Sequence, residues 1–384
     1  MLIRRGLGLI FTVIWLVGCN PAASLQPTQA PARIEAVTPA ATFEFERAYQ
    51  PRPFSFPQDH GSHVSFQTEW WYYTGNLSAP DGRHFGFQLT FFRRGLAPGE
   101  TESRAGLASR QIYFAHFAIT DVDSNNHVSF ERFSRGAAGL AGASGQPFVV
   151  WLEDWRVEAL DDQGDQLLLI SSQDDFSLEL VLNAQKPIVA HGQNGLSPKS
   201  GEPGNASYYL SFTRMTAEGE IGVEGGRFEV TGTAWFDHEW STSALGPQAQ
   251  GWDWFSLQLS NNTELMYFQI RNQDGSLDPV SGGTLVEPDG NSQRLDFQEV
   301  GLEVLDEWTS PDTGAVYPSG WRLTLPAQGV DLIIEPWIKG QEMLTSFVYW
   351  EGAVRITGSV NGEQVTGVGF VELTGYLESM QGVF

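Results

Sequence analysis

Short aromatic runs that alternate with turn residues constrain the fold of this chain more than any other feature. Residues 67–77 (QTEWWYYTGNL) and 84–93 (HFGFQLTFFR) flank an Ala-Pro-Asp-Gly turn at 79–82, a pattern typical of a β-hairpin. Similar runs, separated by turns rich in Gly, Asp and Asn, recur through the rest of the chain. Many short strands at such spacing predict an all-β sandwich or barrel. Helical periodicity is scarce, and we expect only short helices near 100–110 and 299–308.

The length of 384 residues predicts two such domains. We place the first over residues 43–244 and the second over residues 245–384, with the boundary after a tryptophan-rich segment. The longest predicted loop is 190–207, which has no strand pattern and is rich in Gly, Pro, Ser and Asn. Loops of that length inside a compact domain are usually functional or disordered, so this loop is a candidate lid.

The first residues resemble a bacterial export signal. Arg4 and Arg5 precede an apolar run over 7–17, and the run ends in Leu-Val-Gly-Cys at Cys19, which resembles a lipobox. Several acyl chains on such a cysteine anchor a protein firmly, whereas a single chain binds a membrane only marginally. The alternative is an ordinary cleaved signal with an incidental cysteine.

From this pattern we expect residues 1–18 to be a lipoprotein signal peptide and Cys19 to be the lipidated residue. The proline-rich segment 19–42 is then a flexible tether. Asn20 follows the cysteine where an inner-membrane retention signal would have Asp. The predicted location is therefore the cell envelope, as an outer-membrane lipoprotein that faces the periplasm.

Composition and motifs exclude several classes of protein. The chain has one Cys, which rules out an intramolecular disulfide framework and a Cys-rich zinc site. Its net charge of −24 argues against nucleic acid as a partner, because phosphate binding needs clustered Lys and Arg. The sequence lacks a nucleophile elbow, a P-loop and a dinucleotide motif.

Metal ligands are few. Asp59, His60 and His63 could supply hard ligands, as could the Asp-His-Glu run at 237–239. Adjacent strand residues point to opposite faces, however, so one ion could not collect all three residues of that run. We expect neither a metal nor a cofactor.

The run Trp-Phe-Asp-His-Glu-Trp at 235–240 concentrates titratable groups between tryptophans. In a strand, Asp237 and Glu239 would share one face, with His238 on the other. Carboxylates about 7 Å apart in a desolvated aromatic site raise one pKa, and a carboxyl group that stays protonated can act as a general acid. The alternative stays open that these aromatic residues and the histidine belong to a core.

Several long segments resemble the family that contains carotenoid 1,2-hydratases and AttH-like secreted proteins. The matching stretches are DHGSH at 59–63, TEWWYYTGNL at 68–77, FGFQLTFFRRG at 85–95, AHFAITDV at 115–122, AWFDHEWSTSALG at 234–246, GWDWFSLQL at 251–259, YWEGAV at 349–354 and GFVELTGY at 369–376. The resemblance implies two lipocalin-like β-barrel domains packed together, with an apolar cavity for an isoprenoid or a similar molecule. In the hydratases, water is added to a terminal alkene through a carbocation, which aromatic walls would stabilise.

The resemblance carries functional residues over only in part. A His-x-Trp pair of the hydratases matches His238 and Trp240, whereas for their Tyr and Asp the nearest candidates are Trp252 and Asp253. The AttH-like lipoproteins are the closer match, and the resemblance does not define their substrate. The candidate catalytic residues are Asp237, His238, Glu239, Trp240 and Asp253, and the candidate substrate-binding residues are Glu69, Trp70, Trp71, Tyr72, Trp252, Trp254, Tyr349, Trp350 and Glu351.

We therefore expect an envelope lipoprotein that binds a hydrophobic, isoprenoid- or lipid-like small molecule and hydrates or hydrolyses it by acid–base chemistry. In this hypothesis Asp237 or Glu239 is the acid, with Asp253 as an alternative, and His238 positions water. A second hypothesis is a non-catalytic carrier of hydrophobic ligands that serves an ABC-type envelope transport system. A third is a carbohydrate binder or glycosidase that uses the same tryptophans and acids.

Overall fold

The computed structural model describes residues 44–98, 109–242 and 245–382. The predicted signal peptide, Cys19 and the whole of the predicted tether lie outside these residues, as does most of the helix predicted near 100–110. Within them, regular structure consists of strands and three single-turn 3₁₀ helices, η1 (Gln58–His60), η2 (Phe297–Glu299) and η3 (Pro326–Gln328). The all-β prediction is confirmed. No helix in the described ranges is long and apolar enough to cross a bilayer.

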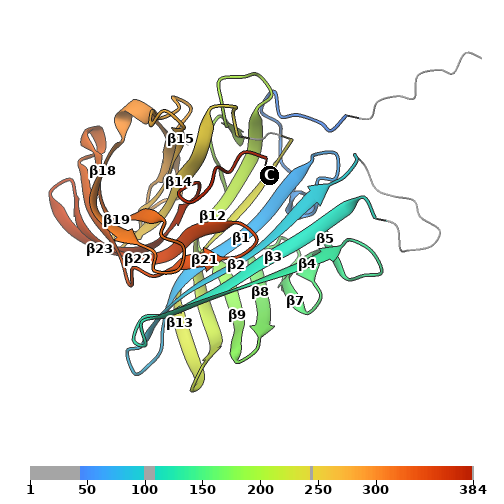
Figure 1. Cartoon of the computed structure of the whole chain (residues 1–384), viewed down its shortest axis with the longest axis horizontal. Helices are drawn as coiled ribbons and strands as arrows, with labels where there is room; N and C mark the ends of the chain where they lie inside the picture. The colour runs from blue at the N-terminus through green and yellow to red at the C-terminus, as the bar shows by residue number, and fades with distance from the viewer. Residues whose placement is uncertain (1–43, 99–108, 243–244, 383–384) are drawn as a thin grey trace, which may run out of the picture. The chain divides into compact units, whose positions relative to one another are not determined.

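The first sheet runs in the order β4-β3-β2-β1-β13-β12-β9-β8-β7-β6-β5, and the short strands β10 and β11 also pair with β12. Its neighbours are antiparallel, and the sheet curls into a barrel-like form (Figure 1). Its strands are β1 (Thr68–Ser78), β2 (His84–Gly95), β3 (Gln111–Asp121), β4 (Asn126–Arg135), β5 (Ala141–Gly145), β6 (Phe148–Leu152), β7 (Trp155–Ala159), β8 (Gln166–Gln173), β9 (Phe176–Ala184), β10 (Val189–Ala190), β11 (Leu196–Pro198), β12 (Ala206–Val223) and β13 (Gly226–Ser241).

The second sheet runs in the order β17-β16-β15-β14-β23-β22-β20-β19-β18, with β21 paired to β22. It is also antiparallel and curls separately from the first sheet (Figure 1). Its strands are β14 (Ala249–Leu259), β15 (Glu264–Asn272), β16 (Gly282–Val286), β17 (Ser292–Asp296), β18 (Gly301–Thr309), β19 (Val316–Leu325), β20 (Val330–Pro336), β21 (Glu342–Leu344), β22 (Val348–Val360) and β23 (Glu363–Leu373).

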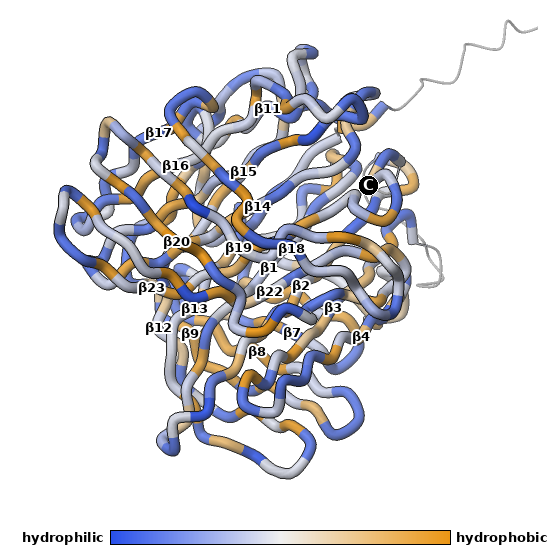
Figure 2. The backbone as a smooth tube through the Cα atoms, turned by 60° about the vertical axis from the view of Figure 1, so that its left-hand side comes forward, coloured by the Kyte–Doolittle hydropathy of each residue, from blue (hydrophilic) through white to orange (hydrophobic). Residues whose placement is uncertain are grey.

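Each sheet closes around its own apolar core. Alternate residues of the strands point inward, as Trp71, Phe85 and Phe236 do in the first sheet and Trp321 and Trp350 in the second. Figure 2 shows the resulting alternation of apolar and polar positions along the strands. Several strands, among them β1 and β14, are nevertheless buried on both faces, because the two sheets pack against each other there.

The contact between the sheets is aromatic and polar. Tyr72 of β1 meets Trp254 of β14 edge to face, with ring centroids 5.2 Å apart. A buried ion pair joins Lys186 Nζ to Glu264 Oε2 across the contact at 2.7 Å. A buried histidine, His191, bridges Thr284 of the second sheet and Ser211 of the first.

Some predicted elements differ from the observed ones. The helix predicted near 299–308 is wrong: beyond η2 this segment is β18, which pairs along its length with β19. Residues 148–159 form two strands, β6 and β7, joined by a turn in which Glu153 has a φ of 58°. The predicted loop 190–207 contains β11, held against β12.

Candidate active site

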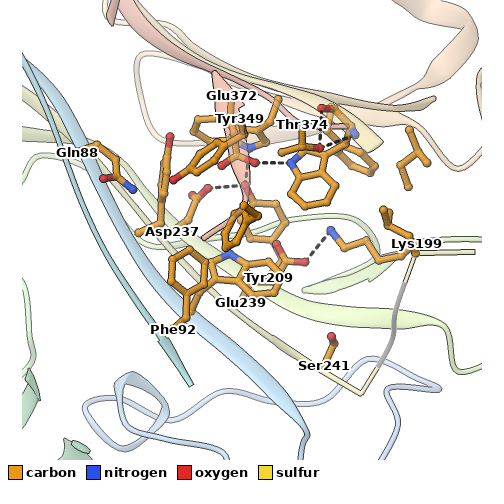
Figure 3. A pocket seen from close by; sticks show the side chains of 18 residues that line it. Gln88, Phe92, Lys199, Tyr209, Asp237, Glu239, Ser241, Tyr349, Glu372 and Thr374 are labelled. Carbon is orange, nitrogen blue, oxygen red and sulfur yellow. Dashed lines mark hydrogen bonds and ion pairs between the residues drawn. The ribbon is translucent and has the colours of Figure 1, made fainter. Parts of the chain in front are cut away.

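A cavity opens where the two sheets meet. It encloses about 1060 Å³ of empty space when its open mouth is included. Figure 3 shows its wall, which is largely aromatic and carries three carboxyl groups and one amine. The lining residues are Trp70, Tyr72, Gln88, Phe92, Lys199, Tyr209, Asp237, Glu239, Ser241, Leu245, Trp252, Trp254, Phe268, Ile270, Phe347, Tyr349, Glu372 and Thr374.

Asp237 reaches the cavity from β13 through strand alternation. Its neighbours Phe236 and His238 point into the core of the first sheet, so Asp237 faces the second. The carboxylate accepts hydrogen bonds from the Tyr209 hydroxyl at 2.6 Å, the Trp235 indole at 2.6 Å and the Ser211 hydroxyl. Although these donors favour the ionised form, burial raises the pKa of Asp237 to about 7.

Glu239 lies two residues along the same face. Its carboxylate pairs with Lys199 Nζ at 2.6 Å (Figure 3). It also accepts a hydrogen bond from the Ser207 hydroxyl. The Lys199 ammonium also lies 5.3 Å from the ring centre of Tyr209 and 5.0 Å from that of Phe268. The loop predicted over 190–207 therefore contributes a cation to the cavity wall.

A second pair of acids faces Asp237 from the second sheet. Glu351 of β22 and Glu372 of β23 are direct cross-strand neighbours, and their carboxyl groups share a hydrogen bond. Tyr72 donates to Glu351 Oε1 at 2.5 Å, and the Trp252 indole donates to Glu372 Oε1 at 2.5 Å. Glu351 Oε2 receives no hydrogen bond from a donor group of the described residues.

Two ionised carboxylates cannot occupy this position, so the pair holds a proton. Burial raises the pKa of Glu372 to about 7, with the charges of Asp237 and Glu239 adding to the shift. Burial, followed by the neighbouring Glu372, raises the pKa of Glu351 well above its usual range. Of the two acids, Glu372 lines the cavity, and Glu351 lies behind it against Tyr72.

The predicted substrate-binding residues divide between this cavity and other places. Trp70, Tyr72, Trp252, Trp254 and Tyr349 line the cavity. Glu351 lies directly behind the wall, through its contacts with Tyr72 and Glu372. Trp350 instead belongs to the core of the second sheet.

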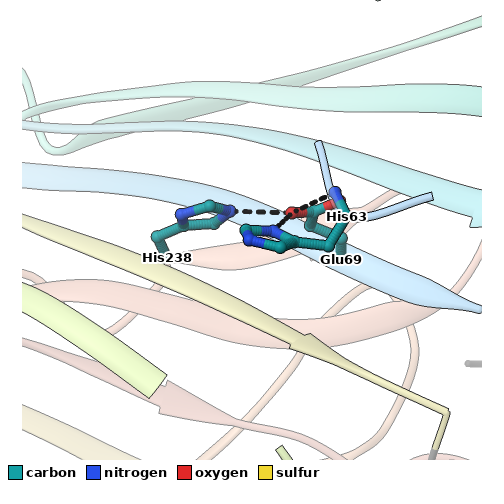
Figure 4. Close-up of side chains that lie close together, drawn as sticks. All are labelled: His63, Glu69 and His238. Atoms are coloured by element: carbon teal, nitrogen blue, oxygen red, sulfur yellow. Dashed lines mark hydrogen bonds and ion pairs between the residues drawn. The ribbon is translucent and has the colours of Figure 1, made fainter. Parts of the chain in front are cut away.

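The remaining candidates on β1 and β13 lie on the opposite face of those strands. Figure 4 shows that the His238 Nε2 and His63 Nδ1 atoms converge on Glu69 Oε1, at 2.9 and 2.7 Å. Trp71 stacks on His238 with centroids 5.0 Å apart, and Trp240 stacks on His63 at 3.8 Å. The structure therefore separates His238, Trp240, Glu69 and Trp71 from Asp237 and Glu239.

This cluster is a buried charge network. Arg93 donates to Glu69 Oε2 at 2.8 Å, and Asp59 lies 3.0 Å from His63 Nε2. Burial works against charge at Glu69, but Arg93 and the two histidines hold its pKa well below the usual range. Burial lowers the pKa of His238, so this imidazole stays neutral.

His63, Glu69 and His238 have ligand atoms within 4.8 Å of one another, the geometry of a metal-binding group. Both ring nitrogens, however, lie at hydrogen-bond distance from one carboxylate oxygen, and Arg93 occupies the other. A bound cation would break these hydrogen bonds and would be repelled by the positive charge of the Arg93 guanidinium. We therefore assign the three side chains to the packing of the first sheet.

Asp253 is buried and does not line the cavity. Its carboxylate accepts hydrogen bonds from Arg271 Nε at 2.9 Å, Gln269 at 2.8 Å and the Tyr376 hydroxyl at 3.1 Å. These partners satisfy both oxygens and fix the start of β14 against β15.

Sequence reasoning did not single out Tyr209 or Lys199, and it mentioned Glu372 only as a neighbour of a candidate segment. A signal for Glu372 exists, because Trp-Glu-Gly and Val-Glu-Leu lie in consecutive strands of one hairpin and register pairs their acids. Tyr209 and Lys199 come from β12 and its preceding loop, where only the fold brings them to the cavity.

Comparison with known proteins agrees with this arrangement. The family model described as AttH-like matches residues 47–376. The chain belongs to the AttH-like family. No curated protein matches the chain in sequence.

Solved structures extend the comparison. An AttH protein from Nitrosomonas europaea is 33% identical, with a TM-score of 0.78 over 87% of this chain and 100% of that one. Kievitone hydratase from Nectria haematococca is 13% identical, with a TM-score of 0.65 over 87% of this chain and 99% of its own. CghA, solved with Sch210972, is 11% identical, with a TM-score of 0.50 over 88% of this chain and 97% of its own. The last two share the fold, two packed lipocalin-like barrels.

Proposed function

We propose that this AttH-like protein adds water to a carbon–carbon double bond of a hydrophobic substrate bound between its two sheets. The observation that carries the proposal is the protonated Glu351–Glu372 pair at an aromatic cavity, with the buried Asp237 carboxylate nearby. A neutral carboxyl group is the acid that protonation of an unactivated alkene requires. The fold shared with a hydratase supports the same chemistry.

In the proposed reaction, Glu372 transfers its proton to one alkene carbon, and the other carbon becomes a carbocation. The indole faces of Trp70, Trp252 and Trp254 line the cavity and stabilise positive charge. Water attacks the cation, and the Asp237 carboxylate accepts the proton that the water loses. Return of that proton to Glu372 completes the cycle, with no net proton gained or lost.

The test is turnover of acyclic terpenoid polyenes by the purified protein, followed as a mass gain of one water molecule. We expect Glu372→Gln to lower kcat by at least about 100-fold, the size of a general-acid effect. Ligand affinity, read by quenching of tryptophan fluorescence, should stay within a few fold. Glu342→Gln is the matched control, because Glu342 is a buried acid of the second sheet that bonds Ser310 and Tyr317 away from the cavity.

Equal turnover by Glu372→Gln and the wild type would overturn the assignment of the acid. Tight binding of polyenes without any hydrated product would instead identify a carrier of hydrophobic ligands. In a carrier, a protonated Glu351–Glu372 pair would serve only to reduce the negative charge of the cavity wall. Binding of soluble oligosaccharides in preference to polyenes would point to the carbohydrate hypothesis.

A further inference from the structure

Three arginines lie at the same end of neighbouring strands of the first sheet. Arg94 is near the end of β2, Arg110 directly precedes β3, and Arg135 ends β4. Register places Arg94 opposite Ile112 and Ile112 opposite Arg135, and the Leu96 amide donates to the Arg110 carbonyl at 2.7 Å. The three residues therefore form one cationic rim.

These arginines have no carboxylate partner among the residues that the structure describes, although the chain carries a net charge of −24. Most other described Lys and Arg residues do form ion pairs. Arg94 is half-buried, and its Nη1 atom is buried without a hydrogen-bond partner in the described structure. Burial lowers the pKa of Arg94, and no described acid opposes the shift. Such a group is ready to receive an anion.

A stack of phenylalanines leads from the cavity toward this rim. Phe92 lines the cavity and stacks on Phe114, with centroids 4.4 Å apart and rings 10° from parallel. Phe114 stacks in turn on Phe133, at 5.5 Å and 26°. Phe347, also of the cavity wall, meets Phe114 edge-on at 6.3 Å. The outermost ring, Phe133, is 56% exposed.

The stack and the rim lie on one face of the sheet. β2, β3 and β4 run side by side (Figure 1), and the stack crosses them in register, Phe92 opposite Phe114 and Phe114 opposite Phe133. Arg94 and Arg135 each lie two residues beyond a stacked phenylalanine, so strand alternation returns them to the same face. The rise over two strand residues separates the two rows by about 7 Å.

We propose that this surface, the phenylalanine–arginine track (Phe92, Phe114, Phe133, Arg94 and Arg135), binds the far end of the substrate. The substrate class is an elongated hydrocarbon chain that ends in a carboxylate or phosphate. Its double bond reaches Glu372, its chain lies along the phenylalanines, and its anionic end pairs with the two arginines. This inference rests on the proposed function, because it takes the cavity as the place where the chain reacts.

Binding measurements test the track without turnover. Oleate and oleyl alcohol, kept below the concentrations at which they aggregate, share one hydrocarbon chain and differ in the anionic end. We expect Arg94→Gln/Arg135→Gln to raise the Kd for oleate about tenfold and to leave the Kd for oleyl alcohol within a factor of two. Arg227→Gln is the control for net charge, because Arg227 is an exposed arginine of the β12–β13 hairpin paired only with Glu220.

Two further variants keep the test decisive. Arg135→Gln alone changes an exposed residue, so it should fold even if the double variant does not, and it should weaken oleate binding selectively. Phe133→Ser should weaken the binding of oleate and of oleyl alcohol alike, by a few fold.

An unchanged oleate Kd in the arginine variants would overturn the proposed binding site, whatever the outcome of the Glu372 test. Loss of binding to anionic vesicles with oleate binding intact would also overturn it, since the rim would then serve a membrane surface.

Discussion

Two carboxyl groups from different sheets have nearly the same acidity. Burial is the main cause in both cases, and it brings the pKa values of Asp237 and Glu372 to about 7. What differs is their partners: Asp237 accepts from three neutral donors, whereas Glu372 accepts from the Trp252 indole and lies opposite a second buried acid, Glu351. The first is therefore suited to accept a proton and the second to release one.

The proposed roles of Glu372 and Asp237 determine how kcat depends on pH. Glu372 must be protonated, which holds below its pKa of about 7, and Asp237 must be ionised, which holds above its pKa of about 7. We expect kcat to follow a bell with its maximum near neutral pH and a loss on both sides. The measurement is kcat from pH 5 to 9, and in Asp237→Asn the acidic limb should disappear. A flat profile would contradict the acid–base pair.

Strand alternation predicted the shared face of Asp237 and Glu239 from sequence alone, because it depends only on neighbouring residues. The same rule separated His238 from them, although His238 stayed on the catalytic list through a family resemblance. Glu372 was harder to find, since its role depends on the register between β22 and β23. The position of Lys199 depends on how the long loop over 190–207 folds, and no local sequence pattern predicts that.

The element η1 shows how tightly the segment before β1 packs. Gly61 directly follows this turn, and a Cβ there would lie 2.4 Å from the Gly145 backbone nitrogen at the end of β5. Gly145 approaches Gln58 equally closely, so two stretches of backbone touch without side chains between them. This contact positions the turn that leads to His63 and the Glu69 network.

We expect Gly61→Ala to destabilise the fold by about 1–3 kcal/mol, the cost of forcing backbones apart in a packed region. Urea unfolding followed by tryptophan fluorescence measures the change. Gly201→Ala is the control, because a Cβ at Gly201 would meet no atom within 4 Å. Equal midpoints for the two variants would show that the turn does not pack against β5.

Strands were predicted best where aromatic residues alternate, as in β1 and β2. The edge strand β18 was missed because its apolar and polar residues do not alternate: Val304 and Leu305 are adjacent and both exposed, and the pairing with β19 is irregular just after them. The short strands β10 and β11 were missed because they form only by pairing with the long neighbour β12. The residues of β10 and β11 carry no strand pattern of their own, and only pairing with β12 makes them strands.

Attachment to a membrane concerns the molecule as a whole. We expect the full chain to fractionate with the outer membrane and Cys19→Ser to release it into the soluble periplasmic fraction with loss of the acyl mass. Membrane fractionation and intact-mass measurement check this. Continued membrane association of the variant would argue against a lipid anchor at Cys19.

In the proposed reaction the proton donor, Glu372, and the proton acceptor, Asp237, belong to different sheets, so no single strand fixes the distance between them. That distance is set by the packing of one barrel on the other, through contacts such as Lys186 with Glu264. In that reaction, a displacement of one barrel against the other by the length of a carbon–carbon bond would place a different carbon of the substrate next to the proton donor. We therefore expect a chimaera that joins barrels from two relatives to fold and, if the proposed reaction is right, to add water at a different carbon.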